Sequence, residues 1–268
     1  MRLLTLAMTT SLALPSLAAA QALPPLPALD ETPTQRTARR AAMTPPVLQE
    51  DAALQAAVAS PSRPAADTAR DVYRHPFETL TFWGLTPGLT VVEIEPGSAG
   101  WWRGILEPYA RNSGGTYVAV NRPADGMGVA DGSADMVVVA RAFHNWARDG
   151  RTAPYMAAFF QALKPGGVLA VEQHRSPGDL DVSVTAPTGY VSEAYVIAAA
   201  EQAGFVLDGR SELNANPRDD HDHPFGVWTL PPVRRSSGQG QTLTPDERAR
   251  YDAVGESDRM TLRFRKPG

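Results

Sequence analysis

The feature that most constrains this chain is a series of short, continuously apolar segments, rich in β-branched residues and bounded by turn residues. Four of them are residues 90–95 (TVVEIE), 116–120 (TYVAV), 135–140 (DMVVVA) and 168–172 (VLAVE). Segments of this kind predict strands that are covered on both faces, as in a parallel sheet.

Segments with helical character lie between these strands and after them. Helices are expected at residues 76–83, 101–109, 154–163 and 192–202, and further strands at 205–213 and 259–265. Thr244, Pro245 and Glu247 form a capping box with proline at the first helical position, which predicts a short helix to about residue 253. Alternating strands and helices predict an α/β fold with a mostly parallel, Rossmann-like sheet and helices on both faces.

Composition excludes some classes of function. The 268 residues are 43% hydrophobic and 20% charged, which supports a packed core, and the net charge of −4 argues against binding to nucleic acid or an anionic membrane. The chain has no cysteine, so disulfides, thiolate metal sites and cysteine nucleophiles are excluded.

The first residues are typical of an export signal. Arg2 precedes an apolar run to about Leu14, and small residues follow, with cleavage expected after Ala20 or Ala22. The run is too short to span a bilayer stably, although an uncleaved anchor is the alternative. We therefore expect a signal peptide at 1–22, a Pro/Ala-rich linker at 23–66 and one domain at 67–268, without a membrane span after cleavage, in the periplasm or secreted. A short helix near residues 48–57 is compatible with the linker's composition.

The turn after the first strand is the expected ligand site, because open α/β sheets bind ligands beyond the carboxyl ends of their strands. It contains Gly97 and Gly100, and the strand before it carries Glu93. Glycine lets the backbone approach a ligand closely, and the following helix presents free N–H groups. Such turns are also common without a ligand, so the turn is a weak signal alone.

Several stretches together resemble class I S-adenosylmethionine-dependent methyltransferases, and in particular a branch of exported, predicted methyltransferases. They are residues 70–76, 93–102, 143–146, 172–175, 189–195, 226–232 and 255–260, together with Asp131–Asp135 and Leu163–Gly167. The resemblance covers residues from about 70 to 264. It implies a seven-stranded-type sheet whose last strand is antiparallel.

The resemblance also implies S-adenosylmethionine as methyl donor and an unidentified small-molecule or envelope component as acceptor. Glu93, Gly97 and Gly100 would hold the donor, with Phe143 facing it. His144 would act as general base, and Asn145 is a second candidate catalytic residue. Glu172 and His174 would line the opening of the same donor site. Alternatively, Glu172 would form a salt bridge with Arg175. His144 has the simpler alternative of a structural hydrogen bond, and Phe143 that of a core residue.

Three departures from the family pattern point to weaker donor binding. Asn121 stands where an acidic residue usually grips the ribose, so Asp131 or Asp125 would have to substitute. The connection at 122–133 is too short for the usual helix and third strand, and Ser98-Ala99 makes the turn bulkier. The alternative function is therefore an exported, non-catalytic protein of this fold that binds another ligand or a protein. A nicotinamide-dependent oxidoreductase is disfavoured because the Gly-x-Gly-x-x-Gly spacing is missing.

The run Asp219-Asp220-His221-Asp222-His223 offers metal ligands, but residues this close together seldom enclose one ion. A solvated loop is the preferred interpretation, and no metal site is predicted. The oligomeric state is left open.

Overall fold

A computed structural model describes residues 51–268. The predicted signal peptide and the linker as far as residue 50 lie outside the described residues, so these assignments stay predictions. None of the helices in the described part is long and apolar enough to cross a membrane.

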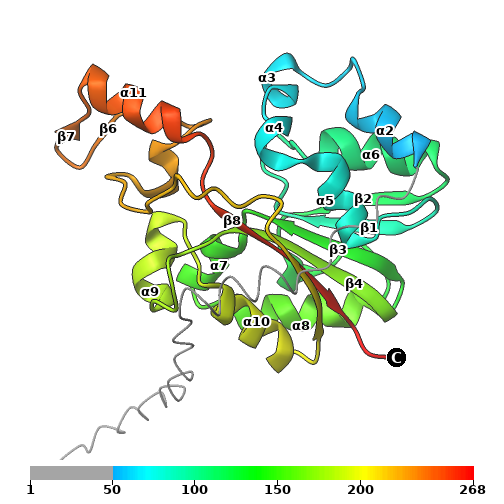
Figure 1. Ribbon diagram of the computed structural model, residues 1–268. Coiled ribbons are helices and arrows are strands. Elements are labelled where there is room, and N and C mark those ends of the chain that lie inside the picture. The colour runs from blue at the N-terminus through cyan, green and yellow to red at the C-terminus, as the bar shows by residue number, and fades with distance from the viewer. Residues whose placement is uncertain (1–50) are drawn as a thin grey trace, which may run out of the picture. The chain divides into compact units, whose positions relative to one another are not determined.

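The domain is built on a six-stranded sheet in the order β2-β1-β3-β4-β8-β5 (Figure 1). Its strands are β1 (Thr90–Ile94), β2 (Thr116–Val120), β3 (Ala134–Ala140), β4 (Leu163–His174), β5 (Val206–Ser211) and β8 (Arg259–Arg265). The strands β2, β1, β3 and β4 are parallel to their neighbours, and β8 runs antiparallel to both β4 and β5. The predicted Rossmann-like, mostly parallel sheet with an antiparallel last strand is confirmed.

The connection between β2 and β3 is as short as the sequence predicted. It contains one 3-10 turn, η1 (Pro123–Asp125), and β2 is the edge strand of the sheet. Within residues 51–268 the usual third strand and its helix are therefore absent.

Helices cover both faces of the sheet. The helices and 3-10 turns are α2 (Ala52–Val58), α3 (Ala65–Thr68), α4 (Asp71–Arg74), α5 (Pro76–Trp83), α6 (Arg103–Asn112), α7 (Phe143–Arg148), α8 (Thr152–Ala162), α9 (Val182–Thr185), η2 (Ala186–Thr188), α10 (Glu193–Gln202), η3 (Gly226–Thr229) and α11 (Pro245–Val254). One face of the sheet packs against α2, α5 and α6, and the other against α7, α8 and α10 (Figure 1).

The two faces explain why the strands are apolar without alternation. In β3, Met136 and Val138 belong to the cluster under α5 and α6, whereas Val137 and Val139 belong to the cluster under α8. All four side chains are fully buried. A strand covered on both sides must be apolar at every position, which is the pattern that identified it.

The capping box is confirmed at the start of α11. The Thr244 side chain accepts from the backbone N–H of Glu247, whose carboxylate accepts from the backbone N–H of Thr244. The short strands β6 (Ser237–Gly238) and β7 (Gln241–Thr242) pair as a hairpin just before this helix.

The helix α2 belongs to the packed domain, although residue 67 was the expected boundary and this segment was assigned to the linker. Leu54 and Ala57 are buried in the cluster that α6 and β1 also form. Asp51 caps the helix through the N–H of Leu54 and accepts a hydrogen bond from the Tyr109 hydroxyl at 2.6 Å. The packed core therefore extends N-terminal to the expected boundary, because the apolar residues within 51–58 pack against α6.

Replacing Leu54 with alanine tests this boundary. If α2 is part of the core, Leu54→Ala lowers the free energy of unfolding by about 2–4 kcal/mol, whereas the exposed neighbour change Gln55→Ala leaves it nearly unchanged. Urea unfolding measures both values. Equal stability of the two variants would return residues 51–58 to the linker.

Candidate functional site

The site lies where the strand order reverses. The chain goes from β1 through α6 to β2 on one side, whereas β3 pairs with β1 on the other side. Ligands of open α/β sheets bind in the crevice that this reversal leaves at the carboxyl ends of the strands. The residues directly after β1, β2 and β3 therefore form the candidate site.

The two glycines of the turn after β1 have different roles. Both have positive φ angles, 69° for Gly97 and 55° for Gly100. A Cβ on Gly97 would meet no atom within 4 Å, so this exposed position is open to a close approach. A Cβ on Gly100 would instead meet the guanidinium of Arg103 at 2.7 Å, so this glycine makes room for a side chain of α6.

Two residues that are not glycine adopt left-handed backbone angles at this edge. Glu95 follows β1 with φ 48°, and Arg141 follows β3 with φ 58°. Such conformations are costly for residues with a Cβ and gather at functional sites. The strained positions terminate the two adjacent strands on either side of the reversal.

The side chain of Arg141 carries an unsatisfied donor. Its Nη1 atom is buried and has no hydrogen-bond partner among the described residues, while its backbone N–H donates to the carbonyl of Glu172 at 2.7 Å. A buried guanidinium nitrogen without an acceptor is unfavourable until an anion supplies one. Arg141 is not among the residues predicted from the sequence, although a cation directly after a buried strand is a signal for such a site.

Glu93 lies deeper than expected for a ligand contact. Its side chain is buried and accepts a hydrogen bond from the Tyr117 hydroxyl at 2.7 Å. Burial raises the pKa of Glu93 to about 7, against the opposing effects of Tyr117 and Arg103. Glu95 is the more accessible carboxylate; burial raises its pKa too, and the nearby side chain of Asn145 opposes that rise.

The predicted catalytic residues lie on α7. His144 is only 5% exposed, and its Nδ1 lies 3.4 Å from Nε2 of Gln173. Burial lowers the pKa of His144 to about 4, so the imidazole is neutral and a weak base. Asn145 is half-buried and lies near enough to Glu95 to lower the pKa of that carboxyl. Phe143 is fully buried against Trp146, with 4.7 Å between ring centroids, which matches its alternative as a core residue.

The structure brings Asn121 to the site and separates Asp131 from it. Asn121 directly follows β2 and is exposed. Asp131 precedes β3 and accepts a hydrogen bond from Gln161, near the end of α8, at 2.8 Å. It therefore lies at the amino end of the parallel strands, opposite Glu95 and Arg141, where it cannot substitute for an acidic residue after β2.

The predicted Glu172–Arg175 salt bridge is wrong. Glu172 is fully buried, lies 2.8 Å from Nε of Arg259 and accepts from the Trp102 indole at 3.1 Å. Arg175 instead binds Asp258 and Glu212. Residues three apart on an extended chain point to opposite faces of the sheet. Glu172 and Arg175 therefore find their partners on different faces.

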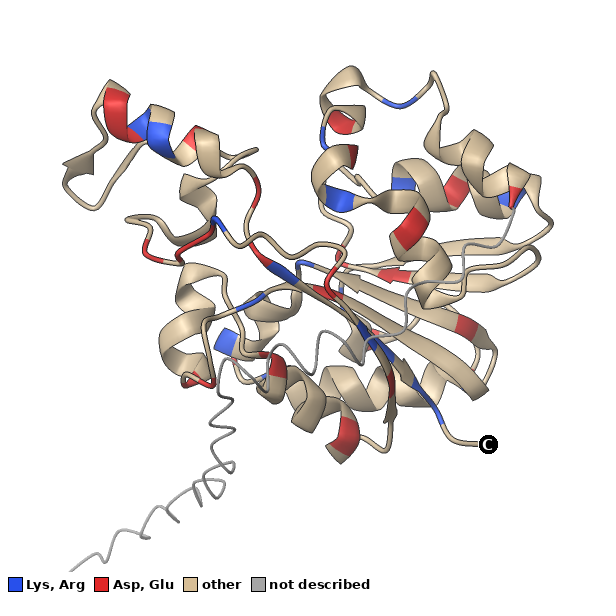
Figure 2. Cartoon of the chain, in the orientation of Figure 1, with Lys and Arg blue, Asp and Glu red and all other residues tan. Residues whose placement is uncertain are grey.

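Buried charges extend from Glu172 into a network. Glu256 accepts hydrogen bonds from Arg70, Arg74 and Arg259, and Arg74, Glu256 and Arg259 are each at most 3% exposed. Basic residues along β8 with acidic neighbours mark this part of the sheet (Figure 2). His174, at the end of β4, lies beside the network, with its Nδ1 2.5 Å from the hydroxyl of Ser257.

The acidic loop is organised around Asp219. Ligand atoms of Asp219, Asp220 and His223 lie within 4.8 Å of one another. However, the Asp219 carboxylate already accepts from Tyr190, from Nε2 of His223 and from the backbone N–H groups of His221 and Asp258. These bonds occupy the lone pairs that a metal would need, so the loop is better described as a structural clamp on the start of β8.

No protein-family model matches the chain, and no curated protein sequence matches it. Among solved structures, an S-adenosylmethionine-dependent methyltransferase from Aquifex aeolicus is 17% identical over 55% of this chain and 88% of its own, with a TM-score of 0.45. The [4+2]-cyclase SpnF is 15% identical over 76% and 82%, with a TM-score of 0.48. A phosphoethanolamine N-methyltransferase from Haemonchus contortus, in complex with S-adenosylhomocysteine, is 14% identical over 73% and 53%, with a TM-score of 0.42.

The chain is similar to these proteins in fold, and its own strand order and directions show a Rossmann-like α/β sheet. A fold hosts many activities, so function rests on the side chains at the reversal of strand order.

The buried carboxyl of Glu93 predicts a pH dependence of stability. The pKa of the Glu93 carboxyl is higher in the folded protein than in the unfolded chain. The stability that the protonated carboxyl contributes is therefore fully present below about pH 4.5 and is lost as pH rises through about 7. Glu93→Gln should therefore raise the free energy of unfolding at pH 8 by roughly 1–3 kcal/mol and change it little at pH 5. Urea unfolding at both pH values measures this change, with the exposed Glu107→Gln as control. Equal effects of Glu93→Gln on the free energy of unfolding at pH 5 and pH 8 would contradict the raised pKa.

Proposed function

We propose that this chain transfers a methyl group from S-adenosylmethionine to an acceptor at the carboxyl edge of β1 and β3. The observation that carries the proposal is the pair of strained residues, Glu95 and Arg141, that flanks the reversal of strand order, one acidic and one with an orphaned donor.

The charges of this pair complement the amino-acid end of the donor, which carries a carboxylate and an ammonium group. Arg141 supplies the guanidinium that would hold the carboxylate, and Glu95 supplies the carboxylate that would hold the ammonium. Gly97 leaves the backbone open beside them, and Asn121 offers its amide to the ribose hydroxyls. The residues present therefore fit the donor. At Asn121 an uncharged amide takes the place of the acidic residue that usually binds the ribose.

The donor supplies an activated methyl group on a sulfonium, so the protein's part is alignment and the exclusion of water. Asn145 lies beside Glu95, where its amide can orient that carboxylate. His144, neutral and buried, shapes the wall rather than accepting a proton at neutral pH. An acceptor that reacts without a strong base, such as an amine or an already ionised oxygen, suits these residues best.

From the expected export signal we further propose that this activity lies outside the cytoplasm, where the acceptor would be a small molecule or an envelope component. Fractionation of cells that produce the full chain tests this part independently. Recovery of a shortened protein from the periplasm or the medium would support export, and recovery of the uncleaved chain from the cytoplasm would contradict it.

Donor binding is tested by calorimetric titration of the purified protein with S-adenosylmethionine and S-adenosylhomocysteine. Arg141→Gln removes the orphaned charge and should weaken binding about 10-fold to 100-fold, as expected for the loss of one charge-assisted hydrogen bond. Arg122→Gln is the matched control, because Arg122 is 83% exposed and only 3.9 Å from Asp125; its affinity should match that of the parent protein.

The proposal fails if the parent protein binds neither compound at millimolar concentration, or if Arg141→Gln and Arg122→Gln bind equally. Thermal unfolding of both variants shows whether any loss of affinity reflects loss of fold. Transfer of a labelled methyl group to any component of a cell-envelope extract would then eliminate the non-catalytic alternative.

A further inference from the structure

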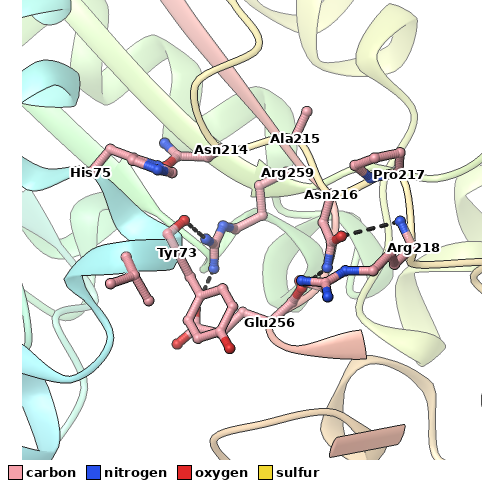
Figure 3. A pocket seen from close by; sticks show the side chains of 11 residues that line it. Tyr73, His75, Asn214, Ala215, Asn216, Pro217, Arg218, Glu256 and Arg259 are labelled. Atoms are coloured by element: carbon pink, nitrogen blue, oxygen red, sulfur yellow. Dashed lines mark hydrogen bonds and ion pairs between the residues drawn. The ribbon is translucent and has the colours of Figure 1, made fainter. Parts of the chain in front are cut away.

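A cavity of about 240 Å³ opens at the other end of the same sheet edge (Figure 3). Tyr73 and His75 line it from the end of α4, residues 214–218 from the loop after β5, and Glu256, Ser257 and Arg259 from the start of β8. Because β8 is antiparallel to β4, its first residue lies beside His174, at the carboxyl end of β4. Two stretches that sequence analysis singled out, 70–76 and 255–260, thus meet around a cavity that the proposed donor site does not use.

Arg259 gives this cavity a buried cation with donors to spare. Its side chain is 1% exposed and contacts Glu172 through Nε, Glu256 through Nη1 and the carbonyl of Tyr73 through Nη2. A guanidinium has five N–H donors, so these three contacts leave two of them unspent. The contacts also fix its orientation, which lowers the entropic cost of binding a ligand.

His75 adds a donor on the opposite wall. The amide of Asn214 satisfies its neighbours when its oxygen accepts from Thr79 and Thr261 and its nitrogen faces the carbonyls of Tyr73 and Arg74 and, at 3.2 Å, Nδ1 of His75. In the arrangement in which the amide donates to Nδ1, the neutral imidazole has its proton on Nε2 and can donate from there. His75 also has a φ of 40°, a strained conformation at a wall of the cavity.

Arg218 supplies a second positive charge at the mouth of the cavity. Its side chain is exposed and forms no ion pair among the described residues, while its backbone N–H donates to Asn216 at 3.1 Å. The one acidic lining residue, Glu256, is bound by three arginines. Arg218 and Arg259 together against Glu256 leave the lining with a net positive charge, which Arg218 supplies.

We propose that this cavity binds a small molecule through a carboxylate or phosphate group, with Arg259, Arg218 and His75 as its donors. The volume is below the range of drug-sized pockets, so the ligand is a metabolite of few non-hydrogen atoms. The proposal is independent of methyl transfer, because no residue of this lining belongs to the donor site.

Calorimetric titration of the purified protein with inorganic phosphate and, separately, with succinate tests the proposal at low ionic strength. Arg218→Gln should weaken binding of the preferred probe by about 5-fold to 20-fold. Arg111→Gln, an exposed arginine on α6, is the matched control and should leave binding unchanged. His75→Asn, which tolerates the left-handed backbone, should weaken binding as well.

Binding of phosphate alone would assign the site to phosphate esters, binding of succinate alone would assign it to carboxylates, and either supports the proposal. The proposal is overturned if neither probe binds at ten times the concentrations typical of metabolites, or if Arg218→Gln and Arg111→Gln bind equally. Titration with S-adenosylmethionine runs in parallel on the same variants, so failure of the one site is distinguished from failure of the other.

Discussion

The structure depends on the buried charges that join β4, β8 and α4. Glu172 pairs with Arg259, and Glu256 binds Arg259, Arg74 and Arg70. Burial raises the pKa of Glu172, and the guanidinium of Arg259 opposes that rise. Removing one partner from such a network leaves an uncompensated buried charge, at a cost of about 3–5 kcal/mol. The antiparallel strand, the loop before it and the helices at 65–74 are therefore held in one arrangement.

The network divides the carboxyl edge of the sheet into two regions. Trp102, just after the glycine turn, donates its indole N–H to Glu172, so the start of α6 and the charged network share one carboxylate. On one side lie Glu95 and Arg141, which end β1 and β3. On the other side lies the cavity whose wall Arg259 forms. In both regions a guanidinium with N–H groups that lack a hydrogen-bond partner lies at the edge where α/β folds bind ligands.

The sheet could be predicted from the sequence because strands covered on both faces have an unmistakable composition. The capping box and the short 122–133 connection were equally readable, since both depend on neighbouring residues only. The pairing of Glu172 was not, because its partner Arg259 is 87 positions away and reaches it only through the antiparallel register of β8. Arg141 and the burial of His144 were missed for the same reason: backbone angles and side-chain exposure follow from tertiary packing.

The donor is proposed to bind between the ends of β1 and β3, with its amino-acid end held by Arg141 and Glu95. A crystal structure of the protein with S-adenosylhomocysteine tests this most directly. If the donor binds as proposed, the carboxylate of the ligand lies within hydrogen-bond distance of the Arg141 guanidinium and its ribose lies beside Asn121. A ligand in the cavity lined by Arg259, or in neither place, would contradict the proposed donor site.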